Sequence, residues 1–238
     1  MITSLQKFSH IVDWPSFMAA RVGDMQDLRL RKFFQAGVCD PDTSVDRVSF
    51  VALDFETTGL HPDRDDIVSI GLIPFTLSGI SCSHAEYWIL NPRQSLDNSV
   101  VIHGITHADV CGAPDLTKIF EDLLEVLAGK IVVAHCLDIE RNFLYNALVK
   151  RLGEGVCFPM IDTMAIEAEK QIKKNGFLQK LFRRRYPSIR LADARQRYGL
   201  PIYQSHHALT DALATAELFL AQLAHHYSPD LPVKKLWR

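Results

Sequence analysis

Two acidic side chains stand close together in an otherwise apolar segment, "RVSFVALDFETTGL" at residues 47–60. Alternate residues of a strand share a face, so Asp54 and Glu56 project together while Leu53 and Phe55 project to the other side. Two carboxylates on one face of a buried strand are costly unless a cation neutralises them, and carboxylate oxygens suit Mg²⁺ or Mn²⁺ better than zinc. The alternative is a pair of strand-end acids that face solvent.

Two further segments carry candidate groups. In "SHHALTDALATAE", Asp211 falls in the first turns of a predicted helix, and His206 and His207 come just before it. Such an acid is often only a partner of the helix dipole, and such a histidine is often a surface residue. In "IVVAHCLDIERNFL" at residues 131–144, Asp138 and Glu140 follow a buried strand, and either is a candidate metal ligand.

The elements that must position these groups are readable from hydrophobic periodicity. Three successive strands joined by short links predict an antiparallel meander: residues 47–60, "DDIVSIGLIPFTL" and "CSHAEYWILNP". After them, helices alternate with short strands: a helix over 116–129, a buried strand "KIVVAH" parallel to the first, a helix "DIERNFLYNALVKRLG", a strand "CFPMIDT", a helix "SIRLADARQRYGL" and a final helix "HALTDALATAELFLAQLAHH". This order predicts an α/β fold with a mixed sheet and helices on its faces.

Composition limits the class of protein. A chain of 238 residues fits one large α/β domain with a small extension, and a net charge of −2 means that any nucleic-acid-binding surface is local. Five cysteines without a CxxC pattern favour neither a disulfide framework nor a zinc site, and a reducing, cytoplasmic setting fits best. No segment has transmembrane length, and the N-terminus lacks the apolar core of a signal peptide.

Taken in order along the chain, the motifs form one set. "DFETTG", "VVIHGIT", "VVAH", "IERNFL", "IDTMAI" and "RYGLPIYQSHHALTDALATAELF" occur between about residues 47 and 224. The chain resembles the DEDDh 3′→5′ exonucleases, the group that contains the proofreading epsilon subunit of bacterial DNA polymerase III, ribonuclease T and oligoribonuclease. The resemblance implies an RNase H-like mixed five-stranded sheet flanked by helices. It divides the chain into an N-terminal helical arm and linker (1–46), an exonuclease domain (47–228) and a C-terminal tail (229–238).

The resemblance also implies roles for the acids and the histidine. Asp54 and Glu56 form the first motif, Asp211 is the last metal ligand, and two Mg²⁺ or Mn²⁺ ions are held between them. His206, spaced His-x4-Asp from Asp211, is the general base, and an imidazole suits that task because its pKa lies near neutral pH. An alternative register uses His207 instead.

The second motif of the family is usually His-Asn-x-x-Phe-Asp-x-x-Phe-Leu. Aligned without gaps on His135 and Phe143-Leu144, its aspartate falls on Glu140. Residues three and four apart share a helix face, so Glu140 should point inward with Phe143 and Leu144. We expect Asp138 to cap the helix N-terminus. Glu140 is thus the predicted fourth ligand, although it is longer than the usual aspartate; Asp138 is the alternative.

Substrate contacts are predicted in two places. In relatives the turn after the first strand holds the terminal nucleotide, so the backbone amides of Thr57 and Thr58 would meet the 3′-hydroxyl, Leu60 would wedge beside the end base, and His103 would line the pocket. His103 is alternatively a structural turn residue. A basic stretch provides either a phosphate track or a solvated helix surface: Lys170, Lys173, Lys174, Lys180, Arg183, Arg184, Arg185, Arg190, Arg195 and Arg197.

The predicted function is a two-metal-ion 3′→5′ exonuclease that releases nucleoside 5′-monophosphates from single-stranded DNA 3′ ends. DNA is favoured over RNA because of the epsilon-like resemblance, and a polymerase or repair protein is a candidate partner. One alternative is a 3′→5′ exoribonuclease. Another is an inactive module that binds nucleic acid or a polymerase and lost activity through the change at Glu140. The helical arm is expected either to pack on the main domain or to dock a partner.

Overall fold

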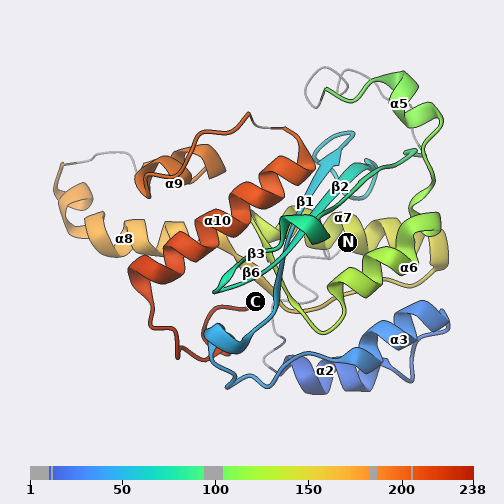
Figure 1. The fold of residues 1–238 in the computed structure, drawn as a ribbon, viewed down its shortest axis with the longest axis horizontal. Coiled ribbons are helices and arrows are strands. Elements are labelled where there is room, and N and C mark those ends of the chain that lie inside the picture. Colours follow the sequence, from blue (N-terminus) through green and yellow to red (C-terminus); the bar gives the residue numbers. More distant parts are fainter. Residues whose placement is uncertain (1–10, 12, 94–103, 183–186, 205) are drawn as a thin grey trace.

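The computed structural model describes residues 11, 13–93, 104–204 except 183–186, and 206–238, with the backbone alone described for 174–182. A mixed sheet forms the centre of the molecule (Figure 1). Across the sheet the order is β3-β2-β1-β5-β6, and β4 shares the outer edge of β2 with β3. The strands are β1 (Phe50–Thr57), β2 (Ile67–Thr76), β3 (Gly79–Ile80), β4 (Glu86–Ile89), β5 (Ile131–Ala134) and β6 (Met160–Asp162).

The strand directions agree with the sequence-based prediction. β2 is antiparallel to β1, and β3 and β4 are each antiparallel to β2, which is the expected meander. β5 runs parallel to β1, and β6 parallel to β5. Because β3 and β4 pair with different parts of the same edge of β2, the six strands occupy the five positions that were predicted.

The helices cover both faces of this sheet. Figure 1 shows α10 on one side of the strands and α7 on the other. The α-helices are α2 (Trp14–Arg21), α3 (Leu28–Ala36), α5 (His107–Cys111), α6 (Leu116–Leu127), α7 (Leu137–Leu152), α8 (Thr163–Phe182), α9 (Leu191–Arg197) and α10 (Ala208–His226). Short 3₁₀ turns are η1 (Val45–Arg47), η2 (Cys82–His84) and η3 (Val233–Lys235). The predicted helices correspond to α6, α7, α9 and α10, and the predicted helical arm contains α2 and α3.

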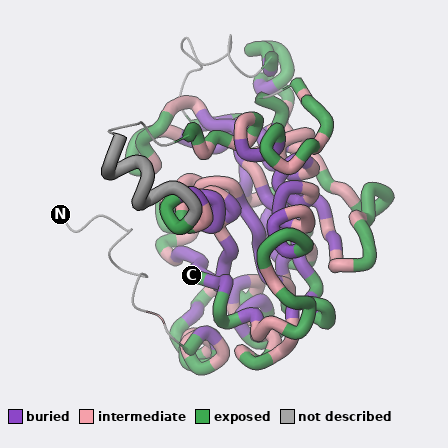
Figure 2. Tube along the Cα trace, turned by 90° about the vertical axis from the view of Figure 1, so that its left-hand side faces the viewer, coloured by how far each residue is buried: buried purple, intermediate pink, exposed green. Residues whose placement is uncertain are grey.

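The alternation along β1 separates two parts of the core. Leu53 and Phe55 pack in one apolar cluster with side chains of α6 and α7, and Ala52 packs in the other with side chains of α10. Figure 2 shows the buried segments gathered in the middle of the molecule, between exposed outer turns. Asp54 and Glu56 therefore lie on the face of the sheet that α10 covers.

Both ends of the described chain pack against the main body. Met18, Phe33 and Phe34 of the arm belong to the same apolar cluster as Leu53. At the other end, the backbone of Arg238 donates to the Met160 carbonyl (2.7 Å) and accepts from the Met160 amide (3.3 Å), which adds a pairing at the edge of β6. The expected packing of the arm is confirmed, whereas the division at residues 46 and 228 stays a prediction. None of the described helices is both long and apolar enough to span a bilayer.

Candidate active site

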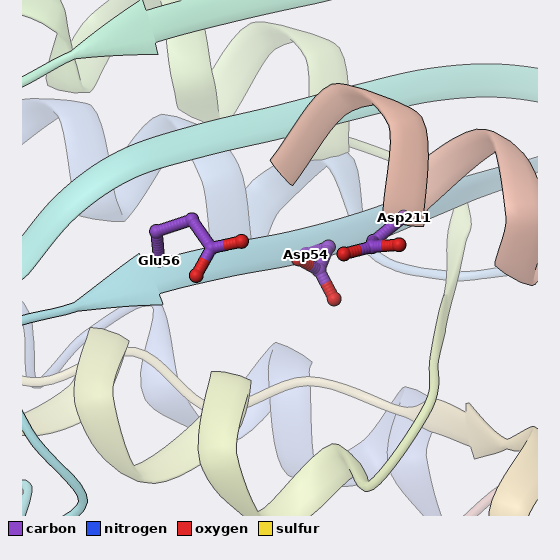
Figure 3. Close-up of side chains that lie close together, drawn as sticks. All are labelled: Asp54, Glu56 and Asp211. Carbon is purple, nitrogen blue, oxygen red and sulfur yellow. The ribbon is translucent and has the colours of Figure 1, made fainter. Parts of the chain in front are cut away.

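Three carboxylates from two distant parts of the chain meet above β1. Asp54 and Glu56 project from the strand, and Asp211 reaches them from the first turn of α10 (Figure 3). Each offers one oxygen, and the three oxygens lie within 4.8 Å of one another. The structure thus brings together the acids of the first and last predicted motifs.

A glycine allows α10 to come this close to the sheet. Gly71 of β2 is the cross-strand neighbour of Asp54, and the backbone of Ala208 lies directly over it. A Cβ atom at Gly71 would lie 2.3 Å from the Ala208 carbonyl carbon and 2.4 Å from the Leu209 nitrogen, far inside van der Waals contact. Asp211 is one turn further along α10, so this contact sets its distance from Asp54. Gly71 could not be recognised as a site residue from the sequence, because a glycine within a strand does not indicate what covers it.

The surroundings of these carboxyl groups oppose their ionisation. Burial, followed by repulsion from Glu140, Asp211 and Glu56, raises the pKa of Asp54 well above its usual value. Burial also raises the pKa of Asp211, while the His206 amide works in the opposite direction. Carboxylates held together in this way are the oxygen-rich donor set that hard divalent cations bind. The residues therefore fit the expected metal ions.

Glu140 is the buried acid of the second motif. It is 2% exposed, as are its neighbours Phe143 (2%) and Leu144 (1%), so the predicted inward face of α7 is confirmed. The Oε2 atom of Glu140 has no hydrogen-bond partner within the described part of the chain. Burial raises the pKa of Glu140 well above its usual value, with Asp162, Asp138 and Glu56 adding repulsion. A buried carboxylate oxygen without a partner is expensive, which supports a cation nearby.

The predicted helix cap was wrong. Asp138 is exposed and lies inside α7, whose N-cap is Cys136. Cys136 adopts a left-handed conformation (φ 79°), and its amide donates to Oδ1 of Asp162 (3.1 Å). The side chain of a distant residue therefore anchors this turn, and the helix begins earlier than expected. Asp162 also accepts from the Met164 amide (2.8 Å), so it joins the starts of α7 and α8.

His206 lies at the rim of the carboxylate cluster. It is exposed, has a positive φ of 70°, and its amide donates to Oδ2 of Asp211 (2.8 Å). His207 is the N-cap residue of α10, and its ring stacks on Tyr87 of β4 at 4.6 Å. Its ring therefore lies against the sheet. Tyr87 had not been singled out from the sequence, since only the fold brings it to this site.

The turn between β1 and β2 is braced internally. The amide of Thr58 donates to the Asp66 carbonyl (2.9 Å), so the expectation that this amide is available to a 3′-hydroxyl is wrong. The Thr57 hydroxyl donates to the Gly59 carbonyl (2.7 Å), and Asp66 forms a buried ion pair with Arg151 (2.8 Å). These contacts leave Leu60 80% exposed at the tip of the turn, where a wedge residue would stand. His103 lies outside the described residues.

The basic stretch divides into residues with different surroundings. Arg195 is 3% exposed and pairs with Glu217 (2.7 Å), so both predictions for this residue, a phosphate track and a solvated helix surface, are wrong. Arg197 pairs with the buried Glu167 (2.8 Å), and Lys173 pairs with Glu169 (2.6 Å). Arg190 is exposed at the start of α9. Arg183, Arg184 and Arg185, and the side chains of Lys174 and Lys180, lie outside the described part.

A mixed sheet with helices on both faces and acids converging at its centre defines an RNase H-like nuclease fold. Comparison with known proteins agrees: the RNase_T sequence profile, described as "Exonuclease", matches residues 51–219. The chain belongs to this family, the DEDDh exonucleases, which are phosphodiester hydrolases, and its exonuclease domain is homologous to those of DNA polymerase III epsilon and PolC-type proteins.

Individual proteins and solved structures are similar to most of this chain. One similar protein is the PolC-type DNA polymerase III of Thermotoga petrophila, with 30% identity. The matched region makes up 75% of this chain but only 12% of that polymerase. The chain is 28% identical to the DNA polymerase III epsilon subunit of Treponema pallidum, covering 76% of this chain and 79% of the subunit. Exonuclease X in complex with 5′ overhanging duplex DNA has the same fold (TM-score 0.57, 18% identity, 77% and 96% of the two chains). So does the nuclease domain of 3′hExo bound to rAMP (TM-score 0.59, 15% identity, 75% and 92%).

Proposed function

We propose that this chain is a 3′→5′ exonuclease that releases nucleoside 5′-monophosphates from the 3′ ends of single-stranded DNA. The observation that carries the proposal is the convergence of Asp54, Glu56 and Asp211 within 4.8 Å, beside the exposed His206. Family membership supplies the reaction class, and the geometry supplies the groups that the reaction needs.

Asp54, Glu56 and Asp211 would hold two Mg²⁺ or Mn²⁺ ions, with Glu140 as the fourth ligand. When bound, these ions would stabilise the negative charge that develops on the attacking and leaving oxygens of the phosphodiester. The raised pKa of Asp54 and the unpartnered Oε2 of Glu140 support this assignment, because a cation would relieve both.

The remaining roles belong to His206 and the β1–β2 turn. His206 would take the proton of the attacking water, a task that requires a neutral imidazole at the rim of the site. The positive φ of His206 is the kind of backbone conformation that concentrates at functional sites. Leu60 at the tip of the turn would pack against the terminal base, and Thr57 would help to shape that pocket.

DNA is preferred to RNA as the substrate because the relatives at 28–30% identity are DNA polymerase III proteins. The polymerase names also make a replication protein a candidate partner. The RNA alternative keeps support, since one similar structure recognises a histone mRNA stem-loop. The inactive-module alternative rests only on Glu140, which keeps a carboxylate where the family has aspartate.

The test is a product ladder. Matched 3′-labelled and 5′-labelled DNA and RNA oligonucleotides, single- and double-stranded, are incubated with the protein in Mg²⁺, Mn²⁺ or excess chelator. We expect stepwise shortening from the 3′ end of single-stranded DNA, with none in chelator. Asp54→Ala should abolish it. Full activity of Asp54→Ala, or activity in chelator, would contradict the proposal.

The same assay separates the two histidines. His206→Ala should lower the rate by about 10²–10⁴-fold, the usual contribution of general acid–base catalysis. His207→Ala is the matched control, one residue away, and should have a much smaller effect. A reversed result would transfer the role of the base to His207.

A further inference from the structure

The loop between α9 and α10 carries His206, and a buried arginine lies at its base. Arg195 is on the last turn of α9 and is 3% exposed. One guanidinium nitrogen donates to the carbonyl of Ala214 in α10 (2.6 Å), and another donates to the carbonyl of Pro201 in the loop (2.9 Å). A single side chain thus joins the two helices to the loop between them.

The charge of Arg195 is matched inside the same cluster. The nitrogen that binds Pro201 also donates to Oε2 of Glu217 (2.7 Å), and the Tyr203 hydroxyl donates to Oε1 of Glu217 (2.9 Å). The guanidinium lies over the Tyr203 ring, 4.5 Å from its centroid. Arginine suits such a position, because its planar group can pair, donate several hydrogen bonds and stack at the same time.

The contacts of this cluster lie just before His206 and just after Asp211 along the chain. Ala214 is one helical turn after Asp211, so Arg195 attaches the end of α9 to α10 just beyond the carboxylate site. Tyr203 is three residues before His206 in the sequence, so its contacts hold the chain close to the histidine. Beyond His206, the ring of His207 stacks on Tyr87. His206 therefore lies in a short span between two anchored points, although its positive φ is unfavourable for a residue with a side chain.

We propose that Arg195, Glu217 and Tyr203 are positioning residues that hold the loop so that His206 stays beside Asp211. This inference rests on the proposed function. It assigns to Arg195 a role in catalysis that requires no contact with the substrate. Misplacing a catalytic group by about 1 Å can lower the rate by up to about 10²-fold, even when the cause is remote from the reacting atoms. Removal of the cluster should therefore lower the rate measurably.

The test removes the cluster without leaving a buried charge unpaired. Arg195→Met with Glu217→Gln eliminates both charges together, and Tyr203→Phe removes only the hydroxyl. We expect the double variant to lower kcat by about 10- to 100-fold while KM and Mn²⁺ affinity, measured by calorimetry, change little. Tyr203→Phe should give a smaller fall in kcat of the same kind.

A matched control lies in the arm. Arg29 pairs with Asp27 (2.7 Å), donates to the Thr117 carbonyl (3.2 Å) and lies over the Phe120 ring at 5.0 Å, so its chemistry is similar but its location is remote. Arg29→Met with Asp27→Asn should lower stability without changing kcat.

The decisive comparison is made in the His206→Ala background. If the cluster acts through His206, adding Arg195→Met and Glu217→Gln to His206→Ala lowers the residual rate no further. If the full 10- to 100-fold fall persists there, or if KM and Mn²⁺ affinity carry the effect instead, the positioning role is overturned while the exonuclease stands. A wild-type protein without nuclease activity would instead reject the proposed function.

Discussion

Glu140 differs from the other acids of the site in its surroundings. It projects from α7 rather than from β1 or α10, is fully buried, and has an Oε2 atom that binds nothing within the described part of the chain. Asp138, two residues earlier, is exposed in the first turn of the same helix. The two residues therefore give opposite expectations for two very similar substitutions.

Glu140→Gln keeps the size of the side chain and removes its charge. We expect activity to fall by at least about 10–100-fold, the cost usually found for groups that merely orient a metal ligand. Asp138→Asn should change activity little, because its side chain faces solvent. Both are assayed on single-stranded DNA over a series of Mn²⁺ concentrations, where raised Mn²⁺ should partly rescue Glu140→Gln. An inactive Asp138→Asn beside an active Glu140→Gln would reverse the assignment.

The carboxylate cluster should also make the metal-free protein sensitive to pH. Burial and mutual repulsion raise the pKa of Asp54 in the folded state. When the pKa of a carboxyl group is higher in the folded than in the unfolded state, the folded state binds its proton more tightly. The protein is then most stable below the unfolded-state pKa of about 4, and this stability is lost as pH rises through the folded-state pKa. In chelator, the free energy of unfolding should therefore fall as pH rises above about 4.

Asp54→Asn removes one of these charges. We expect it to raise the free energy of unfolding of the metal-free protein at pH 7, because burial of the Asp54 charge and its repulsion by Glu140, Asp211 and Glu56 are both removed. Urea denaturation in chelator at several pH values measures this, and added Mn²⁺ should reverse the order by stabilising the wild type. A variant that is less stable than the wild type in chelator at neutral pH would show that the three acids do not repel each other.

At the scale of elements, the contact between α10 and β2 decides the geometry of the site. Gly71→Ala would place a methyl group 2.3 Å from the Ala208 backbone, so α10 must move. We expect a loss of about 1–3 kcal/mol in stability, typical of overpacking. A larger relative loss is expected in Mn²⁺ affinity and activity, because Asp211 moves with the helix.

A matched control is available on a neighbouring strand. Gly79 of β3 also pairs with β2, but a Cβ atom there would meet nothing within 4 Å. Gly79→Ala should therefore leave Mn²⁺ affinity, measured by calorimetry, unchanged. Equal Mn²⁺ affinities for Gly71→Ala and the wild type would mean that α10 is not held by this contact.

At the scale of the whole molecule, the arm belongs to the core although it lies outside the region that the family profile matches. Phe33 is buried and makes an edge contact with Phe158 at 5.6 Å between ring centroids. Phe33→Ala should lower the free energy of unfolding by about 3–5 kcal/mol, the usual cost of removing a buried aromatic ring.

The control is on the same helix. Leu28 is 71% exposed, so Leu28→Ala should change stability by less than about 0.5 kcal/mol. Chemical denaturation measures both variants. If Phe33→Ala cost as little as Leu28→Ala, the arm would be an appended segment rather than part of the folded unit.

The sequence by itself determined the features that depend on local periodicity. The alternation in β1 predicted that Asp54 and Glu56 share a face, and the helical spacing of Phe143 and Leu144 predicted that Glu140 is buried. The strand and helix order predicted the mixed sheet, and the ordered motifs predicted the family. These features were readable because side-chain direction repeats every two residues in a strand and every 3.6 in a helix, whatever the rest of the chain does.

The tertiary structure alone decided the features that depend on contacts between distant residues. In the sequence Arg195 is one of several cations in a basic stretch, and only the structure shows that it is buried and bound to Glu217, Pro201 and Ala214. Asp138 looked like a helix cap until Asp162 anchored the turn before it. Gly71 carried no signal, because its importance lies in the backbone of α10, more than a hundred residues later. Periodicity reports which way a side chain points, but a hydrogen-bond partner or a close backbone approach is set by the segment that packs against it, and only the folded chain brings that segment there.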